Sequence, residues 1–280
     1  MRHRAAKPIG RTWSALAVVL TTLGCAPPGP RLPADHTVAL RKTVHVGPPL
    51  GADISYLAAG DPHGMRLILV HGTPGSAEGW ADYLLEPPAG LEVLALDRPG
   101  FGRSGPEGAV TSLAAQAAAV TALLPADGRP AVLLGHSLGG PIVASVAAQH
   151  PDRVAALVLL AASLDPALEE THPMQALGHW WPVRMLLPRA IRNANAELLA
   201  LRSELVALSS LLARVTAPVI IVHGTADDLV PPANVAFMQA RLSATRCRET
   251  VLLQGSNHFL PWNAEASVRS AIAWAAGQPC

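Results

Sequence analysis

The sequence predicts an α/β protein, a three-layer α/β/α sandwich built around a mostly parallel sheet. Its short runs of Val, Ile and Leu are continuously apolar rather than alternating, which is typical of strands buried on both faces of a parallel sheet. Alanine-rich helical patterns fall between these runs, and such alternation favours right-handed crossovers within one sheet. With 280 residues, 50% of them hydrophobic and 15% charged, the chain can bury a large core.

The folded part begins with a pair of antiparallel strands, because residues 37–46 and 52–59 are parted by a segment rich in glycine and proline. After this pair the apolar runs predict strands, and the alanine-rich patterns predict the helices that connect them. In chain order the strands are expected at 66–70, 91–96, 131–134, 154–160, 218–222 and 250–253, and the helices at 111–124, 138–149, 232–242 and 263–276.

The interval 163–215 interrupts this alternation, since it carries no strand signal. Leucine or valine recurs there with helical spacing, at positions 198, 201, 205, 208, 212 and 215, which predicts a helix over 193–215 with one apolar stripe. We therefore expect a small helical cap, inserted at about 163–215 into a single domain that spans 37–280.

The first 24 residues are typical of a signal peptide. They carry four basic residues and no acidic one, and their apolar run over 13–23 is too short to cross a bilayer as a helix. Residues 21–25, Thr-Thr-Leu-Gly-Cys, resemble the lipobox of bacterial lipoproteins, although Thr22 stands where leucine is usual. In such proteins the chain is cut before the cysteine, which is then lipidated. An ordinary signal peptide followed by a chance cysteine is the alternative.

These features predict export to the bacterial cell envelope, with a lipid on Cys25 that anchors the protein to a membrane facing the periplasm or the exterior. Residues 25–36 are rich in proline and are expected to form an extended tether. An oxidising compartment would also allow Cys247 and Cys280 to form a disulfide, a pairing that the sequence leaves open.

Residues 135–139, Gly-His-Ser-Leu-Gly, match the pattern G-x-S-x-G and stand directly between the expected strand 131–134 and the helix that follows. A tight strand-to-helix turn holds its serine in a strained conformation and needs small flanking residues, so that neighbouring backbone can approach. It also places the serine at a helix N-terminus, where backbone N–H groups favour developing negative charge. This context predicts that Ser137 is a nucleophile.

Three further motifs and a histidine follow other expected strands, and together they resemble the α/β-hydrolase fold family over residues 37–276. Residues 71–75 are similar to the family's HGxPG loop, 97–104 to its DxxGxGxS loop and 223–231 to its HGxxDxxVP loop, and His258 follows the last expected strand. The resemblance implies the family's chain order of nucleophile, acid and base.

Carried onto this sequence, the resemblance implies a triad of Ser137, Asp227 and His258. It favours Asp227 over the adjacent Asp228, because Asp227 has the family's spacing from the start of its loop. It also implies that the backbone N–H groups of Thr73 and Leu138 form the oxyanion hole.

The expected function is that of a serine hydrolase that cleaves a small-to-medium carboxylic ester through an acyl-enzyme intermediate. Carbon–carbon bond hydrolases, thioesterases, lactonases and cofactor-free peroxidases share this fold and triad and stay open. A non-catalytic, surface-anchored binding protein is the alternative of a different class. At least one of Trp180 and Trp181 is expected to lie near the substrate pocket, because aromatic residues make up only 4% of the chain.

A small-molecule substrate is the expected partner, besides the membrane. The sequence contains no H-E-x-x-H motif and no Cys/His cluster, so we expect neither a metal nor a cofactor. The net charge of +1, without a basic stripe interleaved with aromatic residues, argues against nucleic acid.

Within the loop 97–104, Asp97 is expected to accept hydrogen bonds rather than to act as the catalytic acid.

Overall fold

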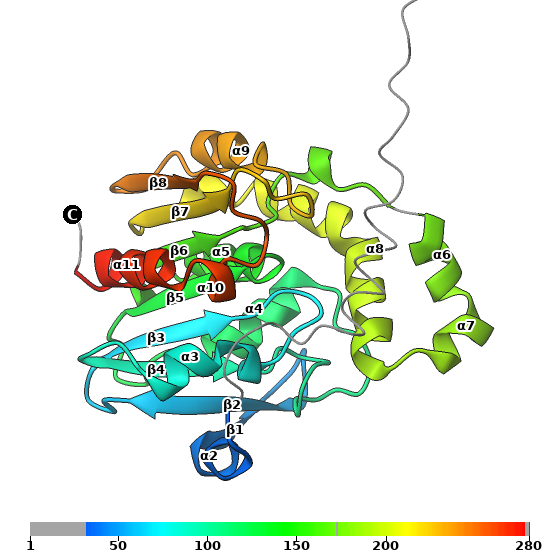
Figure 1. The fold of residues 1–280 in the computed structure, drawn as a ribbon, viewed down its shortest axis with the longest axis horizontal. Helices are drawn as coiled ribbons and strands as arrows, with labels where there is room; N and C mark the ends of the chain where they lie inside the picture. The colour runs from blue at the N-terminus through cyan, green and yellow to red at the C-terminus, as the bar shows by residue number, and fades with distance from the viewer. Residues whose placement is uncertain (1–31, 172, 278–279) are drawn as a thin grey trace, which may run out of the picture.

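A computed structural model describes residues 32–171, 173–277 and 280. Among them one sheet of eight strands runs through the molecule, with helices on both faces (Figure 1). The strands are β1 (Arg41–Val46), β2 (Ala52–Gly60), β3 (Met65–Val70), β4 (Leu91–Leu96), β5 (Ala131–His136), β6 (Val154–Leu160), β7 (Val219–Gly224) and β8 (Arg248–Leu253).

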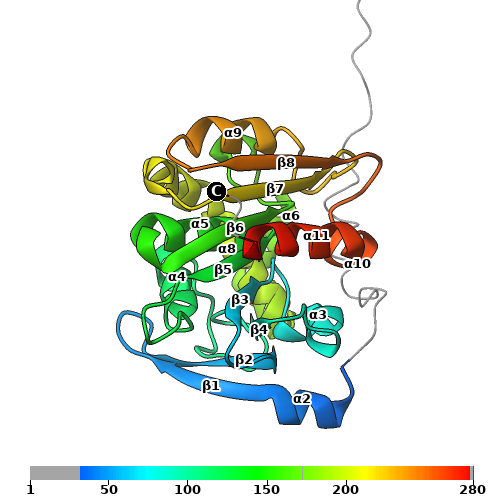
Figure 2. The same ribbon diagram turned by 90° about the vertical axis from the view of Figure 1, so that its left-hand side faces the viewer.

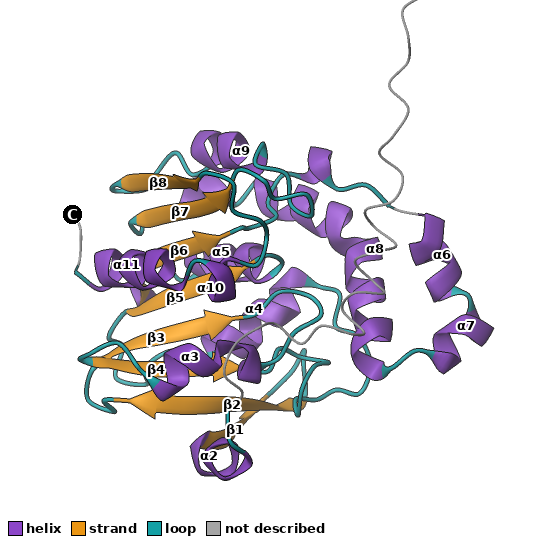
Figure 3. Cartoon of the chain, viewed as in Figure 1, coloured by secondary structure: helices purple, strands orange, loops and turns teal. Residues whose placement is uncertain are grey.

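The strands lie in the order β1-β2-β4-β3-β5-β6-β7-β8. β1 and β2 form an antiparallel pair, β2 and β4 another, and every neighbouring pair from β4 to β8 is parallel. Parallel neighbours end at the same edge of a sheet, so the loops that follow β3, β4, β5, β7 and β8 meet at one edge (Figure 3). We call this edge the carboxyl edge.

Helices form a layer on each face of the sheet (Figure 2). One layer contains α3 (Ala81–Leu85), α10 (Leu260–Asn263) and α11 (Glu265–Ala276); the other contains α4 (Leu113–Thr121), α5 (Gly139–Gln149) and α9 (Asn234–Arg241). Successive residues of β5 enter different layers, since Leu133 packs with the α4 and α5 cluster and Leu134 with the α3 and α11 cluster. Burial on both faces explains the continuously apolar runs and confirms the predicted three-layer sandwich.

The start of the described chain differs from the prediction, because residues 37–40 are helical rather than extended. They belong to α2 (Ala34–Leu40), which also includes residues 34–36 of the expected tether. The N–H and the hydroxyl of Thr37 both donate to Pro33 O, and Asp35 lies in the first turn, where negative charge is favoured. The expected signal peptide and Cys25 lie outside the described residues.

The cap consists of α6 (Pro173–His179), α7 (Trp181–Leu186) and α8 (Arg189–Ser209), with α8 lying along the carboxyl edge (Figure 1). The apolar stripe of α8 packs into the same core cluster as α5, through Leu201, Leu205 and Leu208. The stripe is as predicted up to Leu208, whereas Leu212 and Val215 lie beyond the helix. The helix begins earlier than predicted, after Pro188, and ends earlier, at Ser209. Within the described ranges, no helix combines the length and the apolar character that crossing a bilayer requires.

A disulfide joins Cys247 to Cys280, the last residue, with the two Cα atoms 6.3 Å apart. Cys247 directly precedes the edge strand β8, so the bond ties Cys280 to this edge of the sheet. The pairing that the sequence left open is present in the structure.

We expect Cys280→Ser to lower the free energy of unfolding by about 3–4 kcal/mol, because the bond closes a loop with a sequence separation of 33 in the unfolded chain. Urea denaturation of the oxidised variant and wild type measures the difference. Cys247→Ser and the double variant should lose the same amount, since each removes the same bond. An unfolding midpoint that reductant leaves unchanged would contradict this expectation.

Candidate active site

Ser137 lies in the turn between β5 and α5, where its φ of 56° is in the left-handed region. A side chain on Gly135 would collide with the backbone of Gly139, and one on Gly139 would collide with the carbonyl of Val70. The Ser137 N–H donates to Leu160 O at 3.0 Å, which fixes the turn against β6. The strained turn that the sequence predicts is therefore present, and small residues make it possible.

The loop 71–75 lies directly against this turn. A Cβ on Gly72 would stand 2.8 Å from the Cβ of Ser137 and 3.3 Å from its Oγ, so only glycine permits this approach. Leu138 is the chain neighbour of Ser137 at the start of α5, and Thr73 follows the glycine that touches Ser137. The structure thus brings both candidate oxyanion residues to the serine.

Asp227 and His258 form a hydrogen-bonded pair in which His258 Nδ1 lies 2.8 Å from Asp227 Oδ2. Both residues are buried, and the second carboxylate oxygen of Asp227 accepts the N–H groups of Leu229 at 3.0 Å and Val230 at 2.8 Å. Burial raises the pKa of Asp227, but the hydrogen bond and the charge interaction with His258 outweigh it, so the pKa lies below its usual value. Asp228 is exposed, which agrees with its expected minor role.

His136, the residue before Ser137, brings His258 to the turn. Its Nε2 lies 3.0 Å from the carbonyl oxygen of His258, and the two ring centroids are 4.8 Å apart. The carbonyl can only accept, so His136 carries its proton on Nε2 and donates it. This contact joins the loop after β5 to the loop after β8, and it places Ser137, Asp227 and His258 in one region of the carboxyl edge.

Three buried histidines next to these loops have lowered pKa values, which favours their neutral forms. Burial lowers the pKa of His136 to about 3, lowers the pKa of His71 well below its usual value, and lowers that of His223. A histidine whose pKa is lower in the folded than in the unfolded state stabilises the fold above the unfolded pKa of about 6.5, and this stability is lost as the pH falls below it.

We therefore expect the free energy of unfolding to fall between pH 7.5 and pH 5.5. His136, with its pKa of about 3 in the folded state, contributes about 1 kcal/mol to this fall, and the lowered pKa values of His71 and His223 act in the same direction. Urea denaturation at the two pH values and constant ionic strength measures the change. Substitution of the exposed His63 by glutamine should leave the pH dependence as it is in the wild type. Equal stability at the two pH values would show that the buried histidines take up protons in the folded state.

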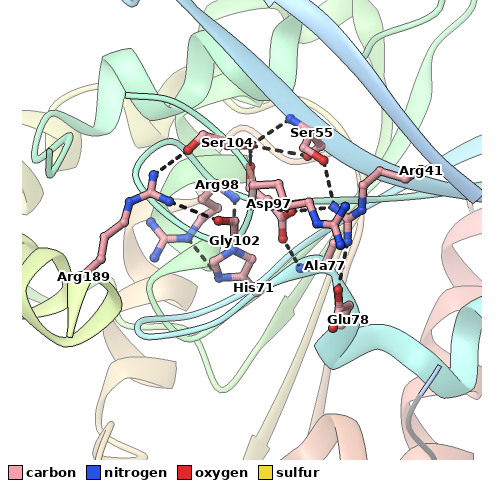
Figure 4. A network of polar contacts seen from close by, with 11 residues as sticks. Arg41, Ser55, His71, Ala77, Glu78, Asp97, Arg98, Gly102, Ser104 and Arg189 are labelled. Carbon is pink, nitrogen blue, oxygen red and sulfur yellow. Dashed lines mark hydrogen bonds and ion pairs between the residues drawn. The ribbon is translucent and has the colours of Figure 1, made fainter. Parts of the chain in front are cut away.

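Asp97 organises the loop after β4 (Figure 4). Its carboxylate accepts the N–H groups of Ala77 at 2.8 Å and Arg103 at 3.0 Å, and it pairs with Arg41 of β1 at 2.8 Å. A side chain on Gly102 would collide with this carboxylate, so glycine is needed there. The expected role of Asp97 as a hydrogen-bonding loop residue is confirmed.

The cap helix α8 is fastened to the same loop by three polar side chains spaced four residues apart, which lie on one face of the helix. Arg189 donates to the carbonyl groups of Gly102, Ser104 and Pro106, Asn193 donates to that of Gly100 at 2.8 Å, and Glu197 accepts from Arg98 at 2.8 Å. Figure 4 shows Arg189 reaching the loop from α8. Sequence reasoning missed these contacts.

Trp180 and Trp181 stand on the outer part of the cap. Their side chains are 59% and 69% exposed, and they stand at the start of α7, a helix without a buried residue. The two short cap helices α6 and α7 lie outside α8, on the side away from the sheet (Figure 1). Neither tryptophan is buried against the body of the protein, and a place for one of them near the substrate pocket stays a prediction.

Within the described ranges, the structure holds no group of three or more His, Cys, Asp or Glu side chains with the arrangement of a metal site. The chemistry available at the carboxyl edge is that of a serine hydroxyl, an imidazole and a carboxylate, with backbone N–H groups beside them. These are the parts of a nucleophilic acyl-transfer site.

The fold and the arrangement of its loops define an α/β hydrolase, and the chain belongs to the α/β-hydrolase fold family. The family model, described as alpha/beta hydrolase fold, matches residues 66–195. A non-heme chloroperoxidase of Streptomyces lividans is 31% identical over 241 residues, which cover 69% of this chain and 86% of that protein. A pimeloyl-[acyl-carrier protein] methyl ester esterase of Aeromonas hydrophila is 28% identical, over 70% of this chain and 89% of the other.

Solved structures show the same fold. The monoacylglycerol lipase of Paleococcus ferrophilus superposes with a TM-score of 0.66 and 22% sequence identity, over 80% of this chain and 99% of that one. At this level of identity the likeness concerns the fold alone, and the chemistry has to be argued from the residues of this chain.

Proposed function

We propose that this chain is a serine hydrolase that cleaves a carboxylic ester through an acyl-enzyme intermediate, with Ser137 as nucleophile, His258 as general base and Asp227 as the orienting acid. The observation that carries the proposal is the hydrogen bond of 2.8 Å between Asp227 and His258, held next to the strained turn of Ser137 by His136. Esterase activity in the name of a relative supports the same class of reaction.

In the proposed reaction, His258 takes the proton of the Ser137 hydroxyl as its oxygen attacks the ester carbonyl. Asp227 accepts the Nδ1–H of His258, so the opposite ring nitrogen is free to act as the base, and the carboxylate stabilises the imidazolium that forms. The N–H groups of Thr73 and Leu138 stabilise the oxyanion, and His258 returns the proton to the leaving alcohol. Attack of water on the acyl-enzyme, by the same steps, releases the acid and restores Ser137.

The proposed substrates are carboxylic esters of small-to-medium size. The cap helix α8 is seated on the body by buried polar contacts and by its leucine stripe, so it covers the carboxyl edge closely. A fixed cover of this kind favours compact esters over long lipids or peptides. The methyl ester esterase among the relatives is consistent with this class.

The mature domain should be tested with p-nitrophenyl esters of graded chain length, from acetate to palmitate. We expect kcat/KM to be highest for short and medium chains and to fall for the longest. Amide and thioester substrates of the same acyl groups serve as comparison, and Ser137→Ala measures the background. Cleavage of amides or thioesters with indifference to every ester would reject the proposed substrate class.

Peroxide-dependent halogenation is the second candidate function, because the relative that is 31% identical is named a non-heme chloroperoxidase. The same preparation should be assayed with hydrogen peroxide and chloride against a chlorinatable diketone. Ester turnover without halogenation would favour the hydrolase, and the reverse result would favour this second candidate.

We further propose export of the protein and a lipid anchor on Cys25, as the sequence predicts. The disulfide between Cys247 and Cys280 supports export, because such bonds persist mainly in oxidising compartments. Cys25→Ala should move the protein from the membrane to the soluble fraction of expressing cells. A variant that stays with the membrane would place the anchor elsewhere.

A further inference from the structure

We propose that Glu197 of the cap and Arg98 of the body are positioning residues that hold the peptide group between Gly72 and Thr73 in the orientation needed for oxyanion stabilisation. The proposal rests on the proposed function, since it concerns the N–H of Thr73 as an oxyanion donor. It adds a direct link from the cap helix α8 to the loop 71–75.

The peptide between Gly72 and Thr73 is fixed through its carbonyl oxygen. Gly72 O accepts a hydrogen bond from the Nδ1–H of His71 at 2.7 Å and another from Arg98 Nη2 at 3.0 Å. The backbone N–H of Arg98 donates to the other ring nitrogen of His71 at 3.0 Å, which sets the tautomer of that histidine. The N–H of Thr73 belongs to the same planar group and points opposite to the carbonyl, so two donors on the oxygen also aim the N–H.

Glu197 holds the arginine that makes this contact. Its two carboxylate oxygens lie 2.8 and 3.0 Å from the two terminal nitrogens of Arg98, a bidentate geometry that fixes the guanidinium plane. The same carboxylate accepts the Thr73 hydroxyl at 2.6 Å and the Gln116 side-chain amide at 2.6 Å. Glu197 thus holds the loop 71–75 through two contacts: one through Arg98, which donates to Gly72 O, and one through the Thr73 side chain.

Burial makes this arrangement stiff. The side chains of Arg98 and Glu197 are 0% and 3% exposed, so water does not replace a missing partner. The ion pair also contacts the loop 71–75, because Arg98 donates to Gly72 O and Glu197 accepts from the Thr73 hydroxyl. Because one partner comes from α8 and the other from the loop after β4, a shift of the cap changes the orientation of the Thr73 N–H.

Glu197→Gln tests the proposal, since it keeps the shape of the side chain and removes its charge. We expect kcat for a short ester to fall about 10- to 100-fold with KM changed less than 3-fold, because a misaimed donor weakens the transition state more than the bound substrate. Affinity for an alkylboronic acid, which forms a tetrahedral adduct on the serine, should fall by a similar factor. Affinity for the product carboxylate should stay within 3-fold.

Glu204→Gln is the matched control. Glu204 lies on the same helix and also ties the cap to the body, because its carboxylate accepts the N–H of Leu113 at 2.8 Å. This hydrogen bond leads to the start of α4 and not to the loop 71–75. We expect kcat and boronate affinity of this variant to match the wild type. Equal losses in Glu204→Gln and Glu197→Gln would overturn the proposal, since they would show only that the cap must be seated.

Arg98→Lys keeps the test decisive if Glu197→Gln does not fold. A lysine ammonium pairs with the carboxylate but lacks the planar fork that reaches Gly72 O at the same time. We expect the same split, with kcat and boronate affinity reduced and KM little changed; wild-type kcat and boronate affinity in either folded variant would refute the positioning role. Wild-type protein that turns over no ester and binds no boronate would instead refute the proposed function itself.

Discussion

Ser137→Ala is expected to reduce kcat for ester hydrolysis by about 10⁴- to 10⁶-fold, because it removes the atom that forms the acyl-enzyme in the proposed reaction. The substitution keeps a Cβ at the positive φ of this residue, so the turn and its hydrogen bond to Leu160 O should stay as they are. The KM of any residual reaction and the thermal melting temperature should change little. Labelling by a fluorophosphonate probe, which bonds to an activated serine, should disappear.

Ser145→Ala is the control for this experiment. Ser145 lies on α5, the helix that Ser137 precedes, and it is buried, but its hydroxyl accepts from the Gln149 side chain and has no place in the proposed chemistry. Wild-type labelling that persists in Ser137→Ala would show that another residue is the nucleophile. Absence of labelling in folded wild-type protein would favour the non-catalytic binding protein over the enzyme.

Asp227→Asn is expected to lower kcat by about 10⁴-fold, while Asp228→Asn lowers it less than 3-fold. Asparagine at 227 can still accept the N–H groups of Leu229 and Val230 through its oxygen, so the loop should keep its shape. Its amide nitrogen then faces Nδ1 of His258, where it donates instead of accepting. The histidine must place its own proton on the opposite nitrogen, which no longer serves as a base.

Steady-state ester hydrolysis by both variants at pH 8 measures the difference, and fluorophosphonate labelling rates give an independent value for the acylation step. The exposed Asp228 makes a close control, because it has the same charge and lies one residue away. Losses of equal size in the two variants would mean that the loop tolerates no change of charge. A large loss in Asp228→Asn alone would transfer the acid role to that residue.

Much of the fold follows from local patterns that physics ties to structure. Runs such as 91–96 and 154–160 are apolar because helices cover both faces of their strands, and the structure has strands with the same bounds, Leu91–Leu96 and Val154–Leu160. The turn at Ser137 is also local, since it needs only small neighbours and a strand before it. Contacts that form within a few residues leave a signal that a single sequence can show.

Contacts between distant segments are harder to foresee. Arg98 and Glu197 are 99 residues apart, and neither stands in a position where a motif assigns a partner. One signal does exist: Glu197 falls four residues before Leu201, on the face that continues as the buried leucine stripe of α8. An acidic residue on a core-facing stripe needs a buried partner, and a basic residue next to the active-site loop is the natural one.

The exposed tryptophans show the opposite case, in which composition draws attention to a residue without fixing its position. A rare residue type is conspicuous in a sequence, but nothing local fixes whether Trp180 faces the body or solvent. The helix α2 is similar, because residues 37–40 suit a strand by composition and the first turn of the helix depends on Pro33 and Thr37.

The polar contacts of α8 bear on how this protein can be re-engineered. The cap is one continuous stretch of chain between β6 and β7, so it could be replaced as a unit by the cap of another protein. Here a donor cap grafted between residues 163 and 215 would bring its own lining but no carboxylate for Arg98, unless it carried an acidic residue where Glu197 stands. The bare guanidinium would then be left in a water-free interior. A chimera should therefore be designed with Arg98 and Glu197 transferred or removed together.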